Sequence, residues 1–376
     1  MAKREKKNNK KRLLLLIVLL VLTVVMLSSA TYAWFISNKT VSVDSLDVQA
    51  RTSNGLEISA DAVNWGVSIN KANLISNSWA GHRNQLPKIL DHVSTVGNLH
   101  TDAGQNYMEL FDGNVAITCD GTVADDGSCE GTEFYTLTTK ATNEINCYDE
   151  NGEETVPDSS KCNGKTYMAF DIFLKVTNDA DLYLGRNATV KKKGDNSFGI
   201  ENAVRVAFLY RGHLTTDEYY TDDASEGEAL AQELNASAND DDPAVVYIWE
   251  PNYDAHTAAG VASGRNYFNV NTISTGTGNA QVEYYGVKTA WDDPIDLTKT
   301  AIPSGTGALS NFADLFELVE PDIITASGHD MQITPIKLKA GVTKFRVYFW
   351  VEGQDVDTEN LATGHDMSLN IELSIN

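Results

Sequence analysis

The chain has 376 residues and carries 52 acidic against 29 basic side chains, which gives a formal net charge of −23 at pH 7. Nucleic acids and anionic membrane surfaces are recognised through basic patches, so this balance argues against both as partners. Fifteen tyrosines, twelve phenylalanines and six tryptophans distinguish the chain from a disordered acidic tail. The composition therefore indicates a folded, strongly acidic protein that is long enough for a large core.

The N-terminal region has the layout of a secretory signal peptide. A basic segment precedes an apolar run over residues 13–27, which is shorter than the roughly 20 residues that a spanning helix needs. We therefore predict a signal peptide over residues 1–33, cleaved near Ala30 or Ala33. An uncleaved membrane anchor is the alternative, and the basic cluster gives both the same orientation. Residues 34–376 are expected to be secreted or held at the cell surface, so that only the N-terminal segment touches the membrane.

Period-two alternation of apolar residues is the dominant pattern after the leader. It is typical of strands that turn one face to the core and the other to water. Many such segments, separated by Gly, Asn and Asp turns and without alternating helices, indicate an all-β fold, an antiparallel β-sandwich that is jelly-roll-like. We predict strands, in chain order, within residues 40–48, 55–59, 167–176, 204–210, 342–352 and 367–375.

A few inserted helices are expected besides the N-terminal signal helix. Ser225 and Glu228 have the spacing of a capping box and predict a helix that starts there. Apolar spacing predicts a second helix over residues 310–319. The acidic segment 217–243 is interpreted as a solvated insertion into one elaborated sandwich domain, and the segment 119–162 as an insertion that contains all four cysteines.

An even, clustered set of cysteines in an exported chain is typical of two disulfides, and the lack of a CxxC spacing argues against a zinc site. Three connectivities are open, and we favour the one in which each bridge closes a short loop with turn residues in or beside it. Closing a loop of about 15 residues stabilises a fold by about 3 kcal/mol in the chain-entropy model. Reduced thiols are the alternative. The favoured pairs are Cys119 with Cys129 and Cys147 with Cys162.

No catalytic motif stands out, and the chain is expected not to be an enzyme. The seven histidines do not form an HExxH pattern, and neither a GxSxG motif, a P-loop nor a Cys–His pair is visible. Trp249 and Trp350 are interpreted as packing residues of a sheet in preference to sugar-binding platforms.

Two acidic stretches are candidate calcium sites. Alternation puts one set of polar residues on a single face if that stretch is extended, and the other set directly follows a predicted strand. Ca²⁺ takes six to eight oxygen ligands, which loops rich in carboxylates can supply, but neither stretch fits an EF-hand. Solvated turn carboxylates are the simpler interpretation, and no other cofactor is expected. The first set is Glu250, Asn252 and Asp254 with His256, and the second is Glu352, Asp355 and Asp357 with Gln354.

The end of the leader (ATYAWF, residues 30–35) and the segment that follows it (VSVDSLDV, residues 41–48) resemble exported proteins of Gram-positive bacteria that depend on a SipW-type signal peptidase. The best-known members are the TasA and camelysin-like biofilm-matrix proteins, and more distal stretches are similar to other surface proteins of Firmicutes. The resemblance implies a jelly-roll fold and fibres in which the N-terminal strand of one subunit completes the sheet of the next. The exchangeable strand would then contain Val41, Val43, Leu46 and Val48.

These observations predict an exported structural protein of the cell surface or extracellular matrix, with a fibre subunit as the specific form. Its partners would be copies of itself or other surface and matrix components. A monomeric surface module that binds carbohydrate or a host ligand is the second hypothesis. A metal-dependent hydrolase is the third.

Overall fold

The computed structural model describes a β-rich protein. Within the described part of the chain, no helix is long and apolar enough to cross a membrane. The predicted leader, with Ala30 and Ala33, lies outside that part. The described residues are 41–50, 55–76, 84–87, 89–102, 105–124, 128–142, 167–185, 187–192, 199–234, 244–251, 256–257, 273–274, 280–281, 285–296, 316–318, 323–324, 335–355, 357–358 and 366–375.

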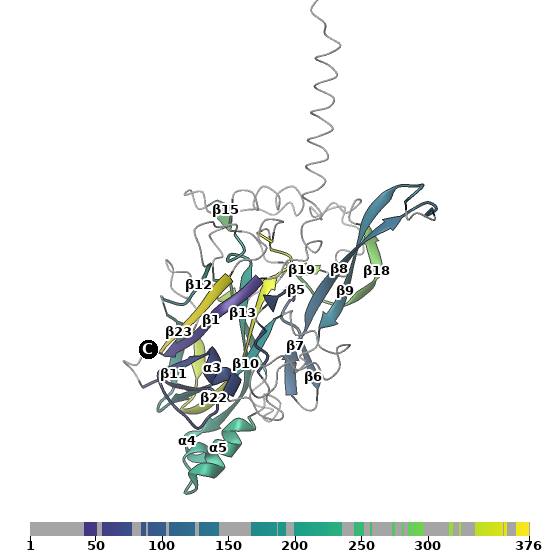
Figure 1. Ribbon diagram of the computed structural model, residues 1–376. Coiled ribbons are helices and arrows are strands. Elements are labelled where there is room, and N and C mark those ends of the chain that lie inside the picture. The colour runs from purple at the N-terminus through teal and green to yellow at the C-terminus, as the bar shows by residue number, and fades with distance from the viewer. Residues whose placement is uncertain are drawn as a thin grey trace, which may run out of the picture.

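The first sheet has seven strands. They are β1 (Val41–Ala50), β3 (Ser68–Asn70), β4 (Ile89–Leu90), β11 (Ala180–Leu184), β12 (Thr189–Lys192), β21 (Ile336–Leu338) and β23 (Asp366–Ile375). Their order is β21–β11–β23–β1–β3, and in addition β12 pairs with β23 and β4 with β1. The first and last described strands of the chain, β1 and β23, are thus neighbours in the middle of this sheet (Figure 1).

The second sheet has ten strands. They are β2 (Glu57–Ser59), β5 (His92–Ser94), β8 (Leu110–Cys119), β9 (Glu133–Thr142), β10 (Met168–Val176), β13 (Val204–Thr215), β14 (Val246–Trp249), β18 (Trp291–Asp296), β20 (Ile323–Ile324) and β22 (Gly341–Glu352). The long strand β22 pairs with β13 along one edge. Along its other edge it pairs with β10 and then, at its C-terminal end, with β5.

Three two-stranded sheets complete the described strands. They are β6 (Leu99–Asp102) with β7 (Gln105–Met108), β15 (Ile273–Ser274) with β16 (Ala280–Gln281), and β17 (Tyr285–Val287) with β19 (Phe316–Leu318).

The sheets are mixed, which corrects the expectation of a purely antiparallel sandwich. β1 with β23, β14 with β20, and β22 with β5 run parallel, while the other strand pairs of the described chain are antiparallel. Each parallel pair joins segments that are far apart in the sequence, and a parallel pair needs no tight turn between its strands. Local alternation predicts strands but does not reveal such distant partners.

The two large sheets enclose one main hydrophobic core. Apolar side chains of β1 and β23 pack there against inward-facing side chains of β10, β13 and β22. On β22 the inward set is Phe345, Val347, Phe349 and Val351, as its alternation predicts. The opposite face of β22 is also buried, because Tyr348 and Trp350 belong to a second apolar cluster with Tyr167 and Leu209. The second sheet is therefore covered on both faces near this strand.

The described part of the chain contains the helices α3 (Lys71–Ser76), α4 (Thr216–Tyr219) and α5 (Ala224–Gln232). The capping box predicted at Ser225 is wrong: the N-cap of α5 is Asp223, whose side chain accepts from the Ser225 N–H, and a capping box occurs one helix earlier, at Thr215 with Glu218. The helix predicted over 310–319 is contradicted at residues 316–318, which form β19.

The acidic insertion is only partly solvated where it is described. Its segment 217–234 contains the end of α4 and all of α5, and it buries Tyr219, Ala231 and Leu234 against Phe173 of β10. This helical pair lies at one end of the molecule (Figure 1). Apolar residues within an acidic segment therefore anchor it to the second sheet.

Candidate functional site

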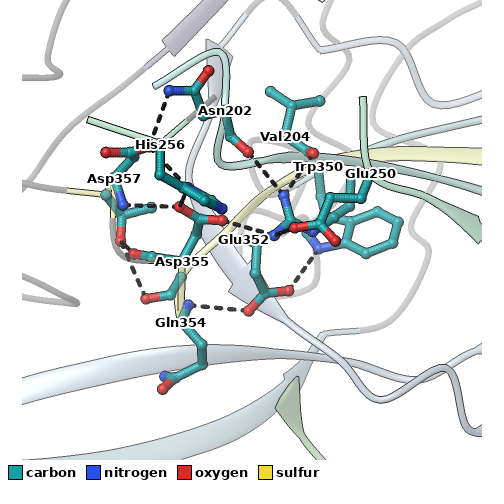
Figure 2. Close-up of polar contacts among 12 residues, drawn as sticks. Asn202, Val204, Glu250, His256, Trp350, Glu352, Gln354, Asp355 and Asp357 are labelled. Carbon is teal, nitrogen blue, oxygen red and sulfur yellow. Dashed lines mark hydrogen bonds and ion pairs between the residues drawn. The ribbon is translucent and has the colours of Figure 1, made fainter. Parts of the chain in front are cut away.

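The two acidic stretches meet at one end of the second sheet. Glu250 directly follows β14, whereas Asp355 and Asp357 lie in the turn after β22. His256 contacts both aspartates (Figure 2). Each of these residues is at most 5% exposed. Together with Arg205 they form a set that we call the buried carboxylate cluster.

Arg205 of β13 supplies a cation within this cluster. β13 pairs with both β14 and β22, and the register places Arg205 opposite Trp350 and beside Glu250. Its Nη2 lies 2.5 Å from Glu250 Oε1 and 2.7 Å from Asp355 Oδ2. Its Nη1 donates to the carbonyl oxygen of Asn202 at 2.9 Å. One guanidinium thus joins the ends of three neighbouring strands.

Asp357 orients His256. The His256 Nδ1 lies 3.0 Å from Asp357 Oδ2 and 3.6 Å from Asp355 Oδ1. Asp357 also accepts hydrogen bonds from Asn202 Nδ2 at 3.0 Å and from the Thr257 backbone N–H at 3.1 Å. The other ring nitrogen of His256, Nε2, is buried and has no hydrogen-bond partner among the described residues.

A backbone N–H of the turn after β22 and the indole of Trp350 hold two of the nearby carboxylates in place. Asp355 Oδ1 accepts from the Asp357 N–H at 2.8 Å, and Glu352 accepts from the indole Nε1 of Trp350 at 3.0 Å. Gly199 packs against this turn with a φ of +87°, and a Cβ added there would lie 2.9 Å from Asp357 Cγ. A glycine is required at this position by both its conformation and its close approach to Asp357.

Burial and charge shift two pKa values in the cluster. Burial raises the pKa of Glu250, and Arg205 only partly opposes this. Burial alone would lower the pKa of His256, but Asp355 and Asp357 outweigh it and raise the pKa to about 8. The imidazole is therefore protonated near neutral pH, and a metal ion that bound to it would have to displace that proton.

This arrangement has two chemical uses. The first is a structural network of ion pairs in which each buried charge has a partner. The second is cation binding, because one ligand atom each from Glu250, His256 and Asp355 lie within 4.8 Å of one another. Glu352 is adjacent, but it is held by Trp350. Asn252 and Asp254, which complete the predicted calcium set, lie outside the described residues.

The predicted disulfide between Cys119 and Cys129 is confirmed, with a Cα–Cα distance of 5.7 Å. It closes the end of the β8–β9 hairpin, so it belongs to a different part of the molecule from the carboxylate cluster. The predicted partners Cys147 and Cys162 lie outside the described residues.

The predicted exchangeable strand is β1. Val43, Leu46 and Val48 are at most 3% exposed, and all three belong to the main core. Val43 pairs with Met367 and Ser45 with Ser368, so Asp44 is an extra residue that forms a β-bulge. The bulge explains why the amphipathic pattern of this segment is weak in the sequence. Val43 and Leu46 share a face although they are an odd number of residues apart.

Sequence reasoning missed Arg205 and Asn202. The sequence predicts only a strand within residues 204–210. The overlooked indication is that Arg205 shares its face with Ala207 and Leu209, both of which are buried in the second apolar cluster. A charge on an otherwise apolar face of a strand implies a buried partner.

Comparisons with protein-family models, curated proteins and solved structures found no match for this chain. The resemblance to the TasA and camelysin-like proteins therefore stays a prediction from the sequence, and functional conclusions rest on the geometry of the molecule.

Proposed function

We propose that this protein is an exported structural subunit of the cell surface or matrix that assembles by exchange of β1. The observation that carries the proposal is the position of β1 in the first sheet. It is the first described segment of the chain, yet it lies between the parallel C-terminal strand β23 and the antiparallel strand β3. A strand in such a position can be supplied by another copy of the chain with the same contacts.

The energetics of β1 support exchange over simple release. If β1 left its subunit, the side chains of Val43, Leu46 and Val48 would lose their burial, at a cost of about 1.5–3 kcal/mol for each large side chain. The edges of β23 and β3 would also present unpaired backbone groups. The β1 of a neighbour restores both, so an assembled chain keeps the contacts of the monomer.

A jelly-roll-like connection of the two sheets and a cleaved signal helix over residues 1–33 belong to this proposal. The acidic composition is compatible with it, because like charge keeps exported subunits soluble and apart before assembly.

Cross-linking between different chains tests the exchange. Gln49 of β1 faces Ser68 of β3, and both are exposed. A Gln49→Cys chain and a Ser68→Cys chain are mixed, allowed to assemble and then oxidised. Exchange predicts disulfide-linked species that contain both variants on a non-reducing gel, because only a donated strand brings these cysteines together.

The matched control replaces Ser68→Cys with Lys140→Cys, since Lys140 is exposed on β9 and does not pair with β1. Equal cross-linking in both mixtures contradicts strand exchange.

In a second experiment, Gln49→Cys and Ser68→Cys are combined in one chain and oxidised before assembly. The disulfide within that chain should block assembly until a reductant is added. Monodisperse particles under all conditions, seen by electron microscopy, would instead favour the monomeric binding module.

A further inference from the structure

The buried carboxylate cluster has one feature that an ion-pair network does not need. His256 Nε2 is buried without a hydrogen-bond partner among the described residues, while Nδ1 lies against Asp357 at 3.0 Å. A histidine that ligates a metal characteristically donates its other ring N–H to a carboxylate, which fixes the tautomer and leaves a lone pair on the ligating nitrogen. The ring extends from Asp357 toward Glu250 (Figure 2).

We propose that Glu250, His256 and Asp355 bind a divalent transition-metal ion, with Asp357 as the residue that positions the imidazole. Their ligand atoms lie within 4.8 Å of one another. Zinc sites are tetrahedral with imidazole nitrogen and carboxylate oxygen at about 2.0–2.2 Å from the ion, so two ligand atoms of one ion lie about 3.4 Å apart. The three side chains would therefore have to close in around the ion by about 1 Å.

The charges of the cluster favour a second cation beside Arg205. The three carboxylates of Glu250, Asp355 and Asp357 surround one guanidinium and one imidazole. Arg205 contacts Glu250 through Oε1 and Asp355 through Oδ2, and every carboxylate has a second oxygen with acceptor capacity. A dication would offset buried negative charge that is otherwise costly.

The donor set selects the class of metal. Ca²⁺ requires six to eight oxygen ligands, whereas an imidazole with two carboxylates suits zinc and its first-row neighbours. The ion would connect the end of β14, the segment 256–257 and the turn after β22. The metal would tie together three segments that are distant in the sequence, and its three protein ligands would leave a fourth position open to water.

Titration of the full chain with Zn²⁺ after removal of metals with EDTA tests this inference. We expect one equivalent of Zn²⁺ to bind and to raise the melting temperature, with no comparable effect of Ca²⁺. Co²⁺ should bind in its place and give visible absorption bands that Zn²⁺ abolishes. His256→Ala should abolish binding, and Asp357→Asn should weaken it by about 10–100-fold.

His100→Ala is the matched control, because His100 stacks on Tyr107 away from the cluster and its loss should leave binding unchanged. The absence of stoichiometric Zn²⁺ and Co²⁺ binding overturns the proposal, as does binding that survives His256→Ala or a preference for Ca²⁺. If His256→Ala does not fold, Asp357→Asn and the Co²⁺ spectrum of the unaltered chain decide.

Discussion

Asp171 illustrates how burial determines the contribution of a charged residue to the stability of this protein. It lies on β10 and pairs with Arg346 at 2.8 Å and Lys344 at 3.1 Å, both on β22. All three residues are at most 4% exposed. Burial lowers the pKa of Lys344 to about 8, and Asp171 opposes that shift. The aspartate therefore keeps its cationic neighbours charged within the fold.

We expect Asp171→Asn to lower the free energy of unfolding by about 3–5 kcal/mol, because it leaves two cations buried without their carboxylate. The control is Asp181→Asn. Asp181 pairs with Lys337 at 2.6 Å, but both side chains are exposed, so water replaces the contact and no measurable loss is expected. Urea denaturation of the two variants measures the difference. Similar losses would show that burial does not set the strength of these ion pairs.

At the residue scale, four of the five residues of the cluster stand out in the sequence. Glu250, His256, Asp355 and Asp357 belong to the two candidate calcium stretches, for which solvated turn carboxylates are the simpler interpretation. The two stretches were expected to act separately, because nothing in local alternation shows that β14 and β22 both lie beside β13. Arg205, which joins them, lies in a mostly apolar strand, so the sequence pattern does not single it out. Long-range register, and not residue type, creates this cluster.

Among the elements, β1 shows how one extra residue changes a pattern. The bulge at Asp44 shifts the register, so that Val43, Leu46 and Val48 all turn toward the core. Deleting Asp44 would give a regular strand with the same inward set. Deleting Asp47 would place Leu46 and Val48 on opposite faces, because side chains alternate along a strand.

We therefore expect the chain that lacks Asp44 to fold with nearly unchanged stability, and the chain that lacks Asp47 to lose several kcal/mol or fail to fold. A single Leu turned outward costs about 1.5–3 kcal/mol. Both deletions remove the same residue type from the same strand, so each is a control for the other. Urea denaturation followed by circular dichroism measures the result. An equal loss in both would mean that the bulge is required for the packing of β1.

Element type was easier to predict from the sequence than element boundaries and partners. The alternating segments that became β10, β13, β22 and β23 are strands, because each presents an apolar face to the main core. The helix expected over 310–319 rested on apolar spacing alone, and residues 316–318 instead pair with β17. Pairing with a distant strand overrides local periodicity in such short segments.

For the molecule as a whole, the described chain consists of a sandwich and an arm. β8, β9 and β18 form the arm, which is the end of the second sheet that extends away from the core (Figure 1). Its base is packed, because Leu110 contributes to the second apolar cluster through its place beside β5. Its end is exposed and is closed by the disulfide between Cys119 and Cys129. The arm therefore depends on the sandwich at one end and on a covalent bond at the other.

We expect loss of this disulfide to loosen the end of the arm without affecting the sandwich. Closing a loop of this size stabilises the ordered hairpin by about 3 kcal/mol in the chain-entropy model, and that contribution is local because the end of the arm has few buried contacts. In a Cys119→Ser/Cys129→Ser variant, hydrogen exchange measured by mass spectrometry should accelerate within residues 118–124 and 128–133. Exchange in β10, β13 and β22 should stay unchanged.

Treating the unaltered chain with a reductant should reproduce the effect at the end of the arm, and the same treatment of the variant should add nothing there. Faster exchange throughout the sandwich would show instead that arm and sandwich unfold as one cooperative unit.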